Sequence, residues 1–224
     1  MKNLYKRYAD VWDKTLPMHA GLKDSKNLTN PLLLKVPDGW HQASTKIMFF
    51  GQETNDWGGI FGESNLDSVL GSYADFYLSG DCFKRYGGWF WNGIARLKQR
   101  IKSKYPDSAF LWNNVVKLGL HGEKGCPPDS FLQVQDEWFS VIAQEVELLE
   151  PDIVLFFCGP SYDRHILKAF QDAAFSPATQ RPVRQLAFVS SSKLPEKTLR
   201  TYHPQYLYSQ SIDDYLDDIF KAIL

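Results

Sequence analysis

The segment from Lys46 to Asn55 constrains the fold more than any other part of the chain. It reads KIMFFGQETN, so an apolar run from Ile47 to Phe50 leads into a glycine and then into short polar residues. A continuous apolar run that ends in this way is typical of a buried strand of a parallel sheet. In open α/β sheets, ligands bind in the crevice beyond the carboxyl ends of such strands. We therefore expect Glu53 to lie where this kind of fold carries out its chemistry.

Three further apolar runs have the length of buried strands, and helical patterns lie between the runs. The predicted strands are Ile47 to Phe50, Ala109 to Trp112, Ile153 to Cys158, and Leu186 to Val189. Apolar residues recur at helical spacing from Phe90 to Ile101, from Phe131 to Leu149, from His165 to Phe175, and from Ser211 onward. Strands that alternate with helices imply right-handed crossovers and a parallel sheet. We therefore expect one domain over residues 1–224, a three-layer α/β/α sandwich whose central parallel sheet has about four strands.

Composition limits the classes of protein to consider. The chain has 224 residues, with 25 Lys and Arg against 26 Asp and Glu, whereas proteins that coat nucleic acid nonspecifically are usually more basic. Its three cysteines form no closely spaced pair, which disfavours zinc and iron–sulfur sites and fits a reducing compartment. No apolar run approaches the roughly 18 residues of a membrane span, and the first residues do not resemble a signal peptide. The sequence predicts a cytoplasmic protein with no metal, no cofactor and no membrane partner.

The predicted strands deliver polar residues to one edge of the sheet. The first strand leads to Gln52 and Glu53, the second to Asn113 and Asn114, and the stretch after the fourth leads to His203. A carboxylate can orient water or stabilise an oxocarbenium-like sugar. An Asn side chain offers one donor and one acceptor to a base edge, and a histidine can donate to charge on a leaving group. These are the groups needed to cleave a base from a sugar, although each could also simply hold a loop or a strand end.

The order and spacing of these residues resemble the uracil-DNA glycosylase superfamily. Gly51-Gln52-Glu53 is similar to the first motif, GQDPY in the best-studied members, and His203-Pro204 lies where the family carries HPS. The segment Trp112 to Lys117 is similar to the TNVVK segment of the iron–sulfur branch, and Pro151 to Leu155 matches the third-strand pattern. The resemblance covers residues 46 to 210.

The resemblance implies the fold of that superfamily and a metal-independent N-glycosylase. Such a monomeric enzyme removes uracil or another damaged base from DNA in base excision repair. Glu53 would take the place of the water-activating aspartate, and His203 would stabilise the departing base anion. Asn114 would bind the base edge, with Asn113 as the second candidate for this role. Gln52 would line the pocket, and the ring that stacks on the flipped base is expected among Trp57, Phe61 and Trp89.

The chain also departs from the family pattern. Glu53 replaces aspartate and Thr54 replaces proline in the first motif, and Gln205 replaces serine in the last. A noncatalytic relative that binds a nucleobase, nucleotide or nucleic acid is therefore the alternative function. Basic residues that precede His203 could form a solvated face or a phosphate-binding patch made by Lys193, Lys197 and Arg200. The base and the strand preference are left open by the sequence.

Overall fold

The computed structural model describes residues 2–20 and 28–223, and a six-stranded sheet is at its centre. The strand order is β2-β1-β3-β6-β5-β4. Strands β2, β1, β3 and β6 are parallel, and β5 is antiparallel to both of its neighbours. The strands are β1 (Thr45–Glu53), β2 (Ser108–Val116), β3 (Ile153–Phe157), β4 (Ala174–Pro177), β5 (Leu186–Ser190) and β6 (Lys197–Thr201).

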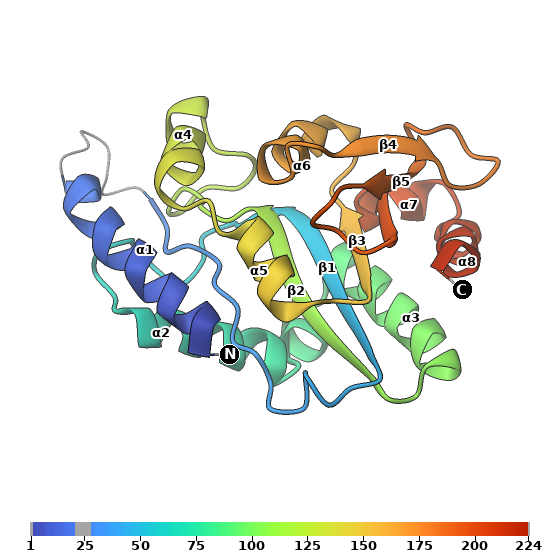
Figure 1. Ribbon diagram of the computed structural model, residues 1–224, viewed down its shortest axis with the longest axis horizontal. Coiled ribbons are helices and arrows are strands. Elements are labelled where there is room, and N and C mark those ends of the chain that lie inside the picture. Colours follow the sequence, from blue (N-terminus) through green and yellow to red (C-terminus); the bar gives the residue numbers. More distant parts are fainter. Residues whose placement is uncertain (1, 21–27, 224) are drawn as a thin grey trace.

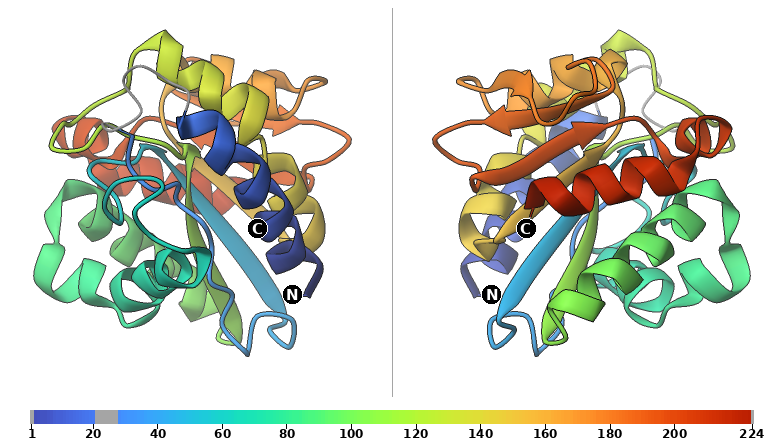
Figure 2. Two further views of the ribbon diagram at one scale, coloured as in Figure 1. Left: turned by 90° about the vertical axis from the view of Figure 1, so that its left-hand side faces the viewer. Right: turned by 90° about the vertical axis from the view of Figure 1, so that its right-hand side faces the viewer.

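Helices cover both faces of this sheet (Figure 1), an arrangement consistent with a three-layer α/β sandwich. One face packs against α1, α2, α4, α5 and α6, and the other against α3, α7 and α8 (Figure 2). The helices are α1 (Lys2–Ala20), α2 (Leu66–Tyr73), α3 (Gly88–Lys104), α4 (Asp129–Trp138), α5 (Ile142–Leu149), α6 (Asp163–Ala169), α7 (Pro204–Ser209) and α8 (Ile212–Ile223). Shorter helical turns are η2 (Ala74–Leu78), η3 (Cys82–Tyr86) and η4 (Pro160–Tyr162).

The sheet differs from the predicted one in its number of strands and in its fourth parallel member. β1, β2 and β3 contain the predicted apolar runs, but the run from Leu186 to Val189 lies in the antiparallel strand β5. The fourth parallel strand is β6, whose sequence KTLRT contains no apolar run. Its polar residues Thr198, Arg200 and Thr201 are nevertheless buried, so they hide the strand from a search for apolar segments.

Two helix predictions were wrong in extent. The pattern from Phe131 to Leu149 forms two helices, α4 and α5, because Phe139 and Val141 at the break are both fully buried. Residues two apart in a continuous helix point about 200° apart, so one helix could not bury both against the same core. The helix predicted from His165 to Phe175 ends at Ala169, and Phe175 belongs to β4.

β2 is an edge strand, and several of its backbone groups are bonded to side chains. The Tyr73 hydroxyl donates to the Trp112 carbonyl at 2.8 Å and accepts from the Trp112 amide at 3.0 Å. The Asn113 Oδ1 atom accepts from the Asn114 amide at 2.8 Å. The Gln135 Nε2 atom donates to the Val115 carbonyl at 3.1 Å, and its Oε1 atom accepts from the Lys117 amide. Unpaired edge groups are costly when buried, so these side chains replace the missing neighbour strand.

Candidate active site

The ends of β1, β3 and β6 are tied together at the carboxyl edge of the parallel strands. The Gln52 Nε2 atom donates to the Cys158 carbonyl at 2.9 Å, which joins the end of β1 to the residue that follows β3. The Gly159 amide donates to the Thr201 carbonyl at 2.9 Å, which joins that strand end to β6. The Gln52 side chain is thereby committed to the backbone. Its contact holds the edge at which Glu53, the last residue of β1, lies.

Asn114 lies within β2 and pairs with Gly51 of β1, whereas the predicted strand ended at Trp112. A Cβ atom built on Gly51 would overlap the Asn114 Oδ1 atom and would lie 3.3 Å from the Phe90 ring. The amide therefore lies over Gly51 and beside Phe90. Asn114 is buried, and its side chain bonds to no residue that the structure describes. Its donor and acceptor remain available to a ligand.

His203 immediately precedes α7, and its ring stacks on the same phenylalanine. The His203 and Phe90 ring centroids are 5.3 Å apart, with 24° between the ring planes. The His203 Nδ1 atom accepts from the Gln205 amide at 3.2 Å. A neutral ring in this position carries its proton on Nε2. Burial lowers the pKa of His203 to about 4, so the ring is neutral near pH 7 and presents Nε2–H as a donor.

Phe90 is the residue of this group that the sequence did not single out. It opens the apolar pattern of α3, and such a residue is normally assigned to the core. α3 begins at the carboxyl edge of the sheet, so its first turn reaches the site and contacts both Gly51 and His203. The preceding Trp89 could have drawn attention to this turn, because it is itself a predicted site residue.

Glu53 is held by a second residue that the sequence did not identify. Its Oε2 atom accepts a hydrogen bond from the Tyr162 hydroxyl of η4. Burial and then the contact with Glu53 raise the pKa of Tyr162, so the hydroxyl stays protonated. Cys126 lies beside both groups. Burial and then the Glu53 charge raise the pKa of its thiol. Glu53 lies two residues beyond Gly51, about 7 Å along the strand and on the same face of a regular strand.

Asn113 points to the opposite face of the sheet, into a buried polar network. Its Nδ2 atom donates to Glu145 at 2.8 Å, and its Oδ1 atom accepts from Lys117 Nζ at 2.7 Å. Lys117 also forms an ion pair with Glu145 at 2.9 Å. The Tyr8 hydroxyl donates to the same carboxylate at 2.5 Å. All four side chains are buried, so the geometry leaves Asn114 as the amide that could read a base.

The three aromatic residues predicted to stack on the base lie in three different places. Phe61 is 2% exposed and belongs to the hydrophobic core, so its ring is not presented at a surface. Trp57 packs edge-on against Trp112 at a centroid distance of 5.4 Å. Trp89 is 54% exposed and packs against Tyr208 of α7 at 4.8 Å. Of the three, Trp89 alone offers a largely exposed ring.

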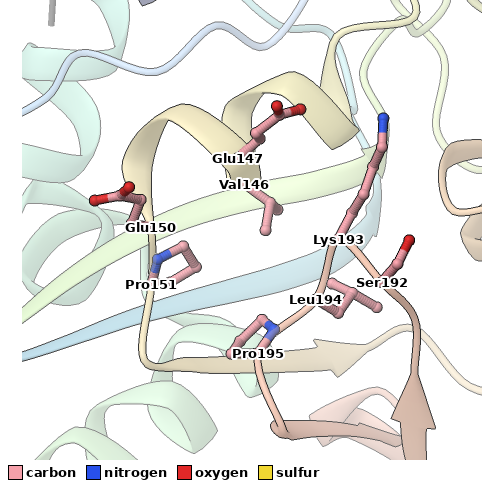
Figure 3. Close-up of a pocket in the computed structure, with 8 residues that line it drawn as sticks. All are labelled: Val146, Glu147, Glu150, Pro151, Ser192, Lys193, Leu194 and Pro195. Atoms are coloured by element: carbon pink, nitrogen blue, oxygen red, sulfur yellow. The ribbon is translucent and has the colours of Figure 1, made fainter.

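The predicted phosphate-binding patch does not form beside His203. Lys197 is the first residue of β6, and Lys193 lies in the loop that leads into it, at the amino end of the strand. Lys193 lines a cavity of about 350 Å³ together with Glu147 and Glu150 (Figure 3). Arg200 is 1% exposed and forms an ion pair with an aspartate of α6. The patch is wrong because two of its members lie at the far edge and the third is buried.

No protein-family model matches this chain, and a search of curated proteins finds no match. Within residues 2–20 and 28–223, no three His, Cys, Asp or Glu residues are grouped as metal ligands would be. No helix in the same ranges is long and apolar enough to cross a membrane. The geometry of the site is what bears on function.

Proposed function

We propose that this chain is a uracil-DNA glycosylase-like domain that hydrolyses the N-glycosidic bond of uracil or another damaged base in DNA. One observation carries the proposal. The Asn114 amide and the neutral His203 imidazole both lie against Phe90, at the sheet edge where β1 ends in Glu53. An amide that could read a base, a donor for a leaving group and a carboxylate for water thus come from β2, from the segment after β6 and from β1, at the same edge of the sheet.

Each group has a definite task in this reaction. The Asn114 amide donates to and accepts from the edge of an extruded base, which stacks on Phe90. This ring takes the role predicted for Trp57, Phe61 or Trp89. It lies beside Gly51, where the Asn114 amide also lies, and it stacks on His203. The His203 Nε2–H donates to the base as negative charge develops on it.

Water completes the reaction beside Glu53. The water oxygen forms a bond to C1′ of the sugar. The bond from C1′ to the base nitrogen breaks, and its electron pair leaves with the base. Glu53 orients the water and accepts one of its protons, and that proton balances the charge of the departing base. The products are a free base and an abasic site.

Exposed aromatic residues around the site support DNA as the partner. Trp89 and Tyr206 are 54% and 42% exposed and lie in the helices that frame His203, α3 and α7. Stacking of bases on such rings does not require a strongly basic surface. This arrangement favours contacts to unpaired bases next to the excised one. A monomer that acts in the cytoplasm remains the prediction made from the sequence.

The test is formation of abasic sites in oligonucleotides that contain one uracil, one hypoxanthine or one mismatched thymine, as single and double strands. Product is expected from at least one substrate. Glu53→Gln and Asn114→Ala should each lower the rate by about 100-fold or more. Glu196→Gln, the same change on the loop before β6, is the matched control and should have no effect.

Binding measured on the same oligonucleotides separates the two functions considered from the sequence. Specific binding without product from any substrate would replace hydrolysis with noncatalytic base recognition. Full activity of Glu53→Gln would remove the carboxylate from the mechanism.

A further inference from the structure

The hydrogen bond between Tyr162 and Glu53 joins the end of β1 to the turn after β3. It uses one oxygen of the carboxylate, Oε2, and leaves Oε1 without this constraint. A carboxylate that orients water must be held in one rotamer, because misplacement of a reacting group by about 1 Å can lower a rate about 100-fold. A contact that fixes one oxygen also fixes the direction in which the other oxygen points.

Glu53 needs such a restraint more than an aspartate would. A glutamate side chain has one more rotatable bond than an aspartate, and freezing each bond costs conformational entropy. The residue also lies at the end of its strand, where Thr54 follows in place of a rigid proline. Neither the length of the side chain nor the local backbone therefore fixes the carboxylate.

Tyr162 is itself well fixed. Its amide donates to the Gly159 carbonyl at 3.1 Å, which closes the η4 turn, and Gly159 is bonded to β6 through Thr201. Its ring packs against His165 at a centroid distance of 5.6 Å. The hydroxyl is thus carried by a turn anchored to two central strands. Cys126 also lies beside the hydroxyl.

We propose that Tyr162 is the positioning residue of the water-orienting carboxylate, and that it compensates for the longer side chain of Glu53. This inference rests on the proposed glycosylase function. In this arrangement Tyr162 does not touch the substrate. It acts by holding Glu53 Oε2 so that Oε1 faces the attacked sugar carbon.

Kinetics of Tyr162→Phe test the catalytic part of the proposal. The variant keeps the ring and removes only the hydroxyl, so kcat should fall by about 10-fold or more while KM stays within about two-fold. Tyr105→Phe, at the C-terminus of α3, is the matched control. In a Glu53→Gln background, Tyr162→Phe should lower kcat no further, because the carboxylate through which it acts is already absent. Equal losses in both backgrounds would overturn the proposal.

Carbon NMR of chains with ¹³C-labelled glutamate carboxyl groups tests the contact without any activity. Glu53→Gln assigns the Glu53 resonance, and Tyr162→Phe should shift it while Tyr105→Phe does not. An unchanged resonance in Tyr162→Phe would disprove the contact and the proposal with it. A shifted resonance in a chain that forms no product from any substrate would overturn the glycosylase function and the catalytic role of Tyr162, but not the contact.

Discussion

A side chain at position 51 would occupy the space that the Asn114 amide oxygen fills. Gly51 is therefore required by the position of a neighbouring side chain, and not by an unusual backbone, because its φ angle is not among the positive ones. The segment Gly51-Gln52-Glu53 and the segment Trp112 to Lys117 thus depend on each other through Gly51 and Asn114. A glycine ends the buried part of β1 so that an amide from β2 can lie over it.

We predict that Gly51→Ala displaces the Asn114 amide and pushes on the Phe90 ring, which lies 3.3 Å from the added carbon. Base excision should fall by at least about 10-fold, with a loss of stability of about 1–3 kcal/mol from overpacking. Rates of abasic-site formation and thermal unfolding measure the two effects. Gly39→Ala is the control, because nothing lies within 4 Å of its added carbon. Unchanged activity in Gly51→Ala would show that the amide does not read the base.

The lowered pKa of His203 predicts a pH dependence of stability. An unfolded histidine titrates near pH 6.5 and the folded one near pH 4, so between these values the unfolded chain binds more protons. Stability should therefore fall as the pH drops from about 6.5 toward 4. His203→Gln removes this contribution, and the stability difference between pH 7 and pH 5 should shrink by about 2 kcal/mol.

Urea denaturation at both pH values measures this change. His165, whose pKa burial also lowers to about 4, contributes in the same direction and stays present in both chains. An equal difference in His203→Gln and the unaltered chain would mean that His203 titrates normally.

The exposed ring of Trp89 leads to a prediction about DNA binding. Trp89→Ala should weaken binding of a single-stranded oligonucleotide by about 1–3 kcal/mol, the usual contribution of stacking on one base. The stability of the Trp89→Ala variant should change little, because Trp89 is 54% exposed. Fluorescence anisotropy measures the affinity, and Leu167→Ala, an exposed apolar residue of α6, is the control. Equal affinities for both variants would place the DNA elsewhere.

The buried ion pair between Lys117 and Glu145 predicts a large loss of stability on removal of one partner. Lys117→Met leaves a buried carboxylate without its cation, which should cost about 3–5 kcal/mol in urea denaturation. Adding Glu145→Gln should restore part of this loss, because the uncompensated charge is then gone. Lys6→Met, which breaks an exposed pair with Asp10, should cause only a small loss of stability. A loss that small for Lys117→Met would contradict the burial of the pair.

Apolar runs made much of the fold predictable. β1, β2 and β3 are strands buried by hydrophobic residues, and their order along the chain implies parallel pairing. β6 was missed because its buried residues are largely polar, and two of them, Arg200 and Thr201, bond to residues distant in sequence. Thr201 Oγ1, for example, donates to the Gln185 carbonyl at 3.0 Å. A partner 16 residues away leaves no local pattern in the sequence.

The candidate site was predictable where one residue followed a strand, and not where two elements had to meet. Gln52 and Glu53 follow an apolar run directly and lie at the expected edge. Phe90 reaches the site because of the direction of α3, and Tyr162 reaches it because of the turn after β3. Neither arrangement could be inferred from the sequence pattern. Arg200 was assigned to the surface because it is charged, whereas its ion pair with Asp163 allows it to be buried.

The side chains that bond to the edge of β2 also limit how this protein can meet other chains. An exposed edge invites a further strand, from a partner or from another copy. The Trp112 amide and carbonyl are already bonded to Tyr73, and the Asn114 amide is bonded to Asn113. Strand addition there would first have to break these bonds, so the part of β2 that contains Asn114 resists pairing with a strand from another chain.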